Sequence, residues 1–275
     1  MSFTFKRADM RTSVTLLMFA IAIIHGCSEQ HYSEVPEGNE VLLGIFGGMG
    51  PEATLDFYKN LLEVTPASKD QEHIPTIIFS NTKVPDRIAA IAESGGDIIP
   101  YLEFSIRKLD EAGASFIAIP CNTVHYFHDE MQSFTDIPVL HLIREAAEEV
   151  AASYPGVRKV GLLATTATIE SGLYHMELNA KGIEVVIPDE DIIVNNVMEA
   201  VFGIKAGTDM KVNEELLAGA ALNLQEKGAE LIVLGCTEIP LAYDSGSVDL
   251  PYINPTRVLA EKSVEMYRSM ITAEN

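Results

Sequence analysis

The chain has 275 residues, of which 47% are hydrophobic, and a formal net charge of −21. This length allows one large or two small domains, and the apolar content is sufficient for a buried core. The negative charge argues against a nucleic-acid-binding protein, because phosphate backbones require a basic surface. It does not identify a basic substrate, since acidic surface charge commonly serves solubility.

The first 26 residues are typical of a secretory signal peptide. Lys6, Arg7 and Arg11 precede an apolar run over residues 14–24. That run is too short to span a bilayer as a mature helix, and its basic start is what an export machinery recognises. We therefore expect residues 1–26 to be removed, which would change the net charge from −21 to −23 because three cations and one aspartate are lost.

Cys27 directly follows Gly26, as the lipidated cysteine follows a small residue in bacterial lipoproteins. We expect Cys27 to carry a lipid and the polar residues 27–40 to form a tether. The protein would then be anchored on the periplasmic side of the cell envelope, at the outer membrane in a Gram-negative host. Simple cleavage without lipidation is the alternative.

The rest of the chain begins with a pattern that occurs twice. Residues 41–51 (VLLGIFGGMGP) read as a buried strand and a glycine turn, and helical spacing follows. Residues 160–168 (VGLLATTAT) repeat this order of strand, small-residue turn and helix, and Gly161 follows Gly44 by 117 positions.

A second pair of segments matches at nearly the same offset. Residues 109–123 (LDEAGASFIAIPCNT) and 224–238 (LQEKGAELIVLGCTE) each read as a helix end, a glycine stop and a strand followed by a cysteine. The cysteines, Cys121 and Cys236, are 115 positions apart. The sequence therefore predicts an internal duplication.

Strands that alternate with helices favour parallel sheets. We predict an α/β protein of two pseudo-symmetric Rossmann-like domains, each a parallel sheet flanked by helices, with the active site in the cleft between them. The first domain would comprise residues 41–140 plus 250–275, and the second residues 141–249.

The position of the two cysteines favours a chemical role. An unassigned pair in an exported protein first suggests a disulfide. However, ligands of parallel sheets bind at the carboxyl ends of strands, where we expect Cys121 and Cys236 to lie. A helix N-terminus after each strand would favour the thiolate. Two buried structural cysteines are the alternative.

Two facing thiols fit the inversion of a stereocentre. Inversion requires one group to remove a proton from one face of a carbon and another to deliver a proton to the opposite face. A thiol suits both roles because its ordinary pKa of about 8.5 is near working pH. A disulfide would abolish them.

Five ordered segments between about residues 41 and 270 resemble the aspartate/glutamate racemase family, and aspartate racemases in particular. They are GGMGPEAT (47–54), SNTKVPDR (80–87), PCNTVH (120–125), GCTEI (235–239) and NPT (254–256). The last segment has Asn254 where the family usually has aspartate.

The resemblance implies a racemase that acts on aspartate or glutamate without a cofactor and without a metal, and that is usually a homodimer. Cys121 and Cys236 match its acid–base pair. The remaining matched residues are those that hold the substrate's amino and carboxylate groups (Asn122, Thr123, Thr237), a contact in the first turn (Met49) and two cations for the side-chain carboxylate (Arg87, Lys205).

Several of these residues have a plain structural alternative. Arg87 would then be a solvated arginine at a helix start, Lys205 a surface lysine near a helix C-terminus, and Met49 a core methionine. His125 either tunes the first thiol or is structural, and Glu238 either orients a donor or caps a turn. No spacing of Cys and His residues suggests zinc, and no glycine pattern suggests a dinucleotide site.

Other functions remain open at this point. Within the same superfamily, a broad-specificity amino-acid racemase, a hydantoin racemase or a maleate isomerase is possible, although Arg87 argues against a neutral hydantoin ring. A lipid-anchored solute-binding protein would explain the export signal, but it gives no reason for symmetric cysteines at strand ends.

Overall fold

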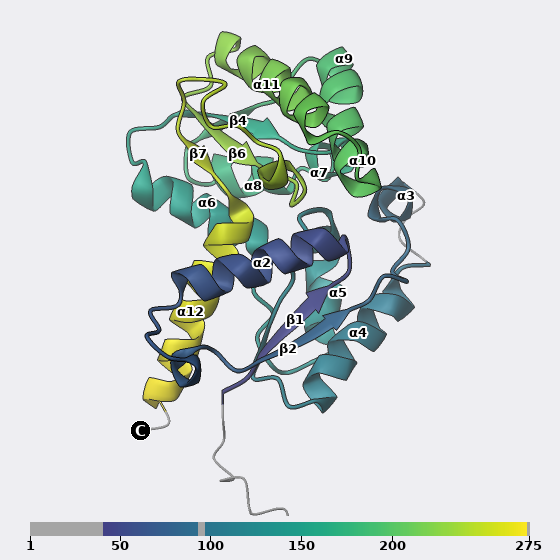
Figure 1. Cartoon of the computed structure of the whole chain (residues 1–275), viewed down its shortest axis with the longest axis vertical. Helices are drawn as coiled ribbons and strands as arrows, with labels where there is room; N and C mark the ends of the chain where they lie inside the picture. Colours follow the sequence, from purple (N-terminus) through teal and green to yellow (C-terminus); the bar gives the residue numbers. More distant parts are fainter. Residues whose placement is uncertain (1–40, 93–96, 274–275) are drawn as a thin grey trace, which may run out of the picture. The chain divides into compact units, whose positions relative to one another are not determined.

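The computed structural model describes residues 41–92 and 97–273, in which helices flank two parallel sheets (Figure 1). The predicted signal peptide, Cys27 and the tether lie outside the described residues. Within the described part, no helix is long and apolar enough to cross a membrane.

The first half contains a three-stranded sheet in the order β2-β1-β3, with parallel neighbours throughout. Short 3-10 or π segments carry the label η. In chain order the elements are β1 Leu43–Gly47, α2 Pro51–Val64, η1 Asp70–Glu72, β2 Thr76–Ser80, α3 Arg87–Ala92, α4 Ile99–Glu111, β3 Phe116–Ala118, η2 Thr123–Phe127 and α5 His128–Ser133.

The turn after β1 depends on glycine. β1 is buried along its whole length, and Gly48 then adopts a φ of +95°. A Cβ at Gly48 would lie 2.5 Å from the main-chain carbonyl carbon of Asn81, so only glycine fits between β1 and the loop after β2. Pro51 begins α2, where its missing N–H needs no partner.

The second half contains a four-stranded parallel sheet in the order β5-β4-β6-β7. Its elements and the closing helix are α6 Leu142–Ser153, β4 Lys159–Leu163, α7 Thr166–Glu170, α8 Leu173–Asn179, β5 Glu184–Val186, α9 Glu190–Ile192, η3 Ile193–Met198, α10 Glu199–Ala206, α11 Met210–Glu226, β6 Leu231–Leu234, η4 Ile239–Leu241, β7 Tyr252–Ile253 and α12 Pro255–Ala273. The sequence predicts that residues 250–275 belong to the first half, but β7 pairs with β6 of the second sheet, whereas α12 packs on α2 and α6.

The packing of equivalent glycines agrees with a duplication. Gly44 and Gly161 lie on the central strands β1 and β4. A Cβ at Gly44 would meet Ala114 and Leu109, and one at Gly161 would meet Ala229 and Leu224, which are the same positions 115 residues later. In both halves the end of a helix and the turn after it therefore pack closely against the central strand, and their side chains leave little room for a Cβ at the glycine.

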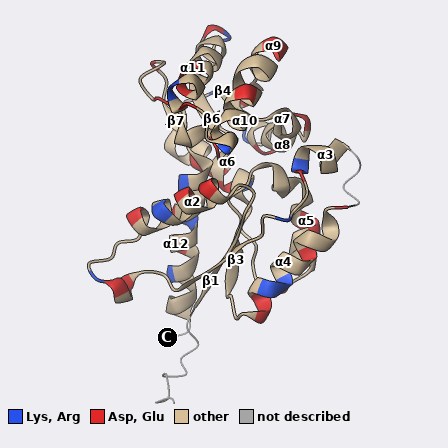
Figure 2. Ribbon diagram, turned by 45° about the vertical axis from the view of Figure 1, so that its right-hand side comes forward, with Lys and Arg blue, Asp and Glu red and all other residues tan. Residues whose placement is uncertain are grey.

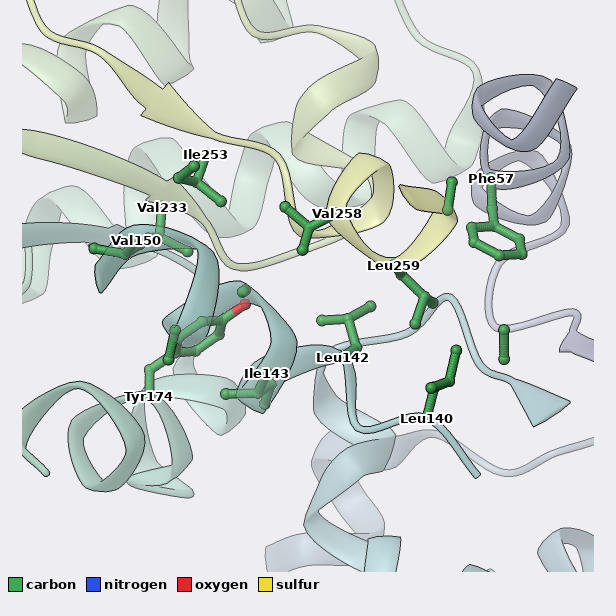
Figure 3. Packing of buried hydrophobic residues seen from close by; sticks show 14 of the residues in the cluster. Phe57, Leu140, Leu142, Ile143, Val150, Tyr174, Val233, Ile253, Val258 and Leu259 are labelled. Atoms are coloured by element: carbon green, nitrogen blue, oxygen red, sulfur yellow. The ribbon is translucent and has the colours of Figure 1, made fainter. Parts of the chain in front are cut away.

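The described residues from 41 onward belong to one compact unit, and a single hydrophobic core runs through both halves. Figure 3 shows part of this core, with Phe57 of α2 and Leu259 of α12 at one side and Tyr174 of α8 and Val233 of β6 at the other. Two further clusters each belong to one half. Side chains of both halves therefore contribute to one core.

Candidate active site

Both candidate cysteines lie just beyond the carboxyl end of a strand. Cys121 follows β3 and Cys236 follows β6, and these residues are only 4% and 6% exposed. Both are free thiols. Residues of both halves, including both cysteines, line one cavity. Two groups that are 115 positions apart in the sequence therefore share one space.

This cavity brings together every residue of the described part of the chain that the resemblance matched to the acid–base pair or to substrate binding. These residues are Met49, Arg87, Cys121, Asn122, Thr123, Lys205, Cys236 and Thr237. The cavity also contains Glu238, for which the sequence left two roles open, and residues that the sequence did not nominate, namely Asp86, Ile88, Thr165, Val201 and Phe202. The structure shows this grouping, and the individual roles stay predictions.

A buried histidine holds the loop that carries Cys121. His125 Nε2 accepts a hydrogen bond from the Leu142 amide (3.1 Å), so the assigned tautomer donates from Nδ1 to the carbonyl oxygen of Cys121 (2.7 Å). Burial lowers the pKa of His125 to about 4, and its imidazole is neutral near pH 7. Because these hydrogen bonds go to main-chain atoms, the geometry supports the structural alternative for His125.

The amide of Asn122 has a free donor in the cavity wall. The Tyr174 hydroxyl donates to Asn122 Oδ1 (2.6 Å), which fixes the orientation of the amide. Asn122 Nδ2 is buried and has no hydrogen-bond partner among the described residues. An unpaired buried donor is costly, so this N–H group is a natural contact for a carboxylate of a bound substrate.

Three threonine hydroxyls connect the two halves beside the cavity. Thr123 Oγ1 lies 2.9 Å from Thr168 Oγ1, which lies 3.0 Å from Thr165 Oγ1. Thr165 also caps the N-terminus of α7. Sequence reasoning missed Thr165, although the repeat makes it the equivalent of Gly48 in the first glycine turn.

Cys236 has a carboxylate as its closest polar partner. Its thiol donates to Glu238 Oε2 over 3.0 Å, and the Glu238 side chain is only 5% exposed. Burial, followed by the adjacent Glu238 charge, raises the pKa of the Cys236 thiol well above its usual value. In this arrangement Cys236 is a protonated thiol, and Glu238 is a part of the site rather than a turn cap.

Two cations reach the cavity from α3 and α10. Arg87 Nη1 donates to the carbonyl oxygen of Pro85 over 3.0 Å. Lys205 Nζ lies 3.4 Å from Glu238 Oε1. Burial opposes the charge of Lys205, but Glu238 and the two thiols outweigh it and raise the pKa of Lys205. Acidic residues occur on helices of both halves (Figure 2), and in the cavity Arg87 and Lys205 stand beside two carboxyl groups, those of Asp86 and Glu238.

The prediction that an α-helix begins directly after each cysteine is wrong. The segments that follow are the short 3-10 helices η2 Thr123–Phe127 and η4 Ile239–Leu241. Such short segments align few peptide dipoles, so they provide little stabilisation of a thiolate. Lys205 is the candidate for this electrostatic role, because it lines the same cavity as Cys121 and Cys236.

The described residues contain a group of three histidines but no metal-binding arrangement. His125, His128 and His141 stack with ring centroids 4.4–6.0 Å apart behind the Cys121 loop. No three or more His, Cys, Asp or Glu side chains of the described part are placed to hold a metal ion.

The fold is an α/β fold with two duplicated halves, and residues from both halves line one cavity that holds two free thiols. The model of a family described as Asp/Glu/Hydantoin racemase matches residues 46–262. The chain therefore belongs to the Asp/Glu/hydantoin racemase family and is an amino-acid racemase. Both the predicted family and the predicted fold class are confirmed.

Characterised and solved relatives cover most of the chain. The broad specificity amino-acid racemase RacX of Bacillus subtilis (strain 168) is 29% identical over 233 residues, which is 82% of this chain and 98% of that protein. The structure of an aspartate racemase from Picrophilus torridus has a TM-score of 0.72 and 31% identity, covering 83% of this chain and 98% of that one. An aspartate racemase homologue from Pyrococcus horikoshii OT3 has a TM-score of 0.67 and 30% identity, covering 82% and 98%.

Proposed function

We propose that the protein interconverts L- and D-aspartate or glutamate by proton transfer between Cα and two cysteines. Cys121 or Cys236, as thiolate, removes the α-proton from one face, and the other thiol protonates the opposite face. The observation that supports this most strongly is that two free thiols from duplicated halves line one cavity. This chemistry needs neither a cofactor nor a metal.

The polar groups of the cavity suit an amino acid with a second carboxylate. Asn122 Nδ2, Thr123 and Thr237 offer hydrogen bonds to the amino-acid head group. Arg87 and Lys205 would bind the side-chain carboxylate, and an arginine can grip a carboxylate with two hydrogen bonds. The aspartate racemase and the aspartate racemase homologue among the relatives support this assignment.

A broad-specificity racemase is the second candidate, and two observations favour it. Lys205 already pairs with Glu238, so only part of its charge is available to a substrate. An adjoining cavity shares Arg87, Lys205, Asp86 and Glu238 with the first and is also lined by Glu52. Its mixed charge would tolerate side chains other than acidic ones. RacX, a relative, carries the description of broad specificity.

Incubation of the purified full-length protein with single L-amino acids in deuterated water would test the function. We expect loss of the α-proton NMR signal together with appearance of the D-isomer on chiral chromatography. Aspartate or glutamate as the best substrate would support the first candidate, and similar rates for many amino acids the second. An unchanged α-proton for every amino acid would refute both and favour a binding protein.

Export, lipidation and dimer formation are further proposals. The basic start, the apolar run and Cys27 support secretion and lipid attachment on the periplasmic side of the envelope. The resemblance to the racemase family supports a homodimer, which light scattering of the purified protein would test.

A further inference from the structure

The two halves of the duplicated site differ two positions after each cysteine. Cys236 is 115 positions after Cys121, and at this offset the equivalent of Glu238 is Thr123. The first thiol therefore has a neutral hydroxyl at this place, whereas the second has a carboxyl group. The two thiols occupy equivalent positions in the cleft, but only the second has an ionisable carboxyl group beside it.

The carboxyl group of Glu238 is in direct contact with the second thiol. Cys236 Sγ and Glu238 Oε2 are 3.0 Å apart, and both residues are buried. Ionisation of Cys236 would place two negative charges side by side in an environment with little water, where their repulsion is strong. As long as Glu238 is ionised, its carboxylate favours the proton on sulfur.

One cation compensates part of this negative charge. Lys205 Nζ lies 3.4 Å from Glu238 Oε1, which is buried and makes no hydrogen bond among the described residues. A single ammonium group can balance one negative charge of the Cys236–Glu238 pair but not two. The other titratable or charged groups around the pair are Cys121, Tyr174, Arg87, Asp86 and, in the adjoining cavity, the exposed Glu52.

We propose that Glu238 is a positioning residue that keeps Cys236 in the thiol form in the free enzyme, so that the enzyme rests with Cys236 as acid and Cys121 as base. This inference rests on the proposed two-cysteine function. The Cys121 thiolate takes the α-proton, and Cys236 gives its proton to the opposite face of the carbanion. Cys121 is then a thiol and Cys236 a thiolate, and exchange with water restores the resting form.

This resting form, with Cys121 as thiolate and Cys236 as thiol, favours one enantiomer of the substrate. The enantiomer whose α-hydrogen faces Cys121 meets a ready base, whereas its mirror image needs the rarer form in which Cys236 is ionised. Because racemisation has an equilibrium constant of one, kcat/KM must be equal in both directions and cannot show this preference. An irreversible reaction of the same bases can.

The first test follows the thiol without reference to turnover. Cys236 of the full-length protein is alkylated with iodoacetamide between pH 6 and 10, and the modified peptide is quantified by mass spectrometry. We expect E238Q to move the alkylation profile of Cys236 down by at least one pH unit, or about tenfold in rate at pH 8. E52Q removes a nearby exposed carboxylate of the adjoining cavity and should leave the profile in place.

A second variant keeps the carboxylate and removes its cation. K205M should move the Cys236 profile upward, opposite to E238Q, because the charge of Glu238 is then unbalanced. This opposite shift does not depend on whether E238Q folds. An unmoved profile in both variants, or an equal shift with E52Q, would overturn the proposal.

Elimination of chloride from β-chloroalanine tests which enantiomer the enzyme prefers. Removal of the α-proton expels chloride, and the resulting 2-aminoacrylate hydrolyses to pyruvate and ammonia. Because this reaction is irreversible, kcat/KM need not be equal for the two enantiomers. We expect the wild-type protein to prefer, at least tenfold, the enantiomer that C236S still processes, and E238Q to reduce this preference. Equal rates for both enantiomers in the wild type would overturn the proposal.

The combined outcomes distinguish the two proposals. Shifted alkylation profiles without racemisation would refute the proposed function alone. Racemisation with unmoved profiles would refute the role of Glu238 alone.

Discussion

Replacement of either cysteine by serine should nearly abolish racemisation and leave the fold intact. A hydroxyl is a far weaker acid than a thiol, and one positioned acid–base group contributes about 10²–10⁴ in rate. Because Cys121 and Cys236 are 4% and 6% exposed, bulk water has little access to replace either group. We therefore expect a loss of about 10²–10⁴ for each single variant, or about 3–5 kcal/mol in the activation barrier.

The double variant distinguishes a coupled pair from two independent groups. Independent effects would multiply to about 10⁴–10⁸, whereas groups that serve one reaction should lose little more together than singly. Racemisation of C121S, C236S and C121S/C236S is measured by chiral chromatography, and circular dichroism with thermal unfolding checks the fold. A folded single variant that keeps more than a tenth of the wild-type rate would refute the two-thiol mechanism.

The two single variants should also act on opposite enantiomers of β-chloroalanine. C121S retains only Cys236 as a base, and C236S retains only Cys121, so each should eliminate chloride from the opposite enantiomer. Pyruvate formation coupled to lactate dehydrogenase measures both rates. If one variant processed both enantiomers equally, the two thiols would not lie on opposite faces of the substrate.

Three further predictions concern specificity, acid stability and export. Arg87→Ala should raise KM for aspartate by the equivalent of about 2–5 kcal/mol and barely change alanine kinetics. Equal losses would make Arg87 structural. Burial lowers the pKa of His125 to about 4 and of His141 to about 3, whereas unfolded histidine titrates near 6.5. Stability should thus be fully present above pH 6.5 and fall as the pH drops towards 4, by about 3 kcal/mol for His125. Thermal unfolding between pH 7.5 and 4.5 measures this, and a constant midpoint would contradict it. Cys27→Ser should prevent palmitate labelling and membrane attachment in fractionated cells; full-length protein that stays unlabelled and cytoplasmic without the substitution would argue against export.

The candidate site was largely predictable because the sequence repeats itself. Equivalent cysteines after equivalent strands indicated a shared cleft, since parallel strands end at the same edge of a sheet. Arg87 and Lys205 were found through the resemblance, and both line the cavity. The helix-dipole argument failed because sequence periodicity does not separate a short 3-10 turn from the start of an α-helix. The number of residues that continue the helix decides its dipole.

Other features depended on contacts between distant segments. Tyr174 reaches Asn122 across 52 positions, and β7 joins the second sheet while α12 packs on α2 and α6. No local pattern encodes such pairings, because they depend on how the two halves pack around the common core.

By itself, the sequence determined the duplication, the alternation of strands and helices, and the positions of the two candidate cysteines after equivalent strands, because each depends on the order of residues along the chain. Only the tertiary structure decided their electrostatic state. Glu238 could orient a donor or cap a turn until the fold placed its carboxylate 3.0 Å from one thiol and 3.4 Å from Lys205. The charge balance of a site depends on distance and burial in space, and neither is a property of the linear order.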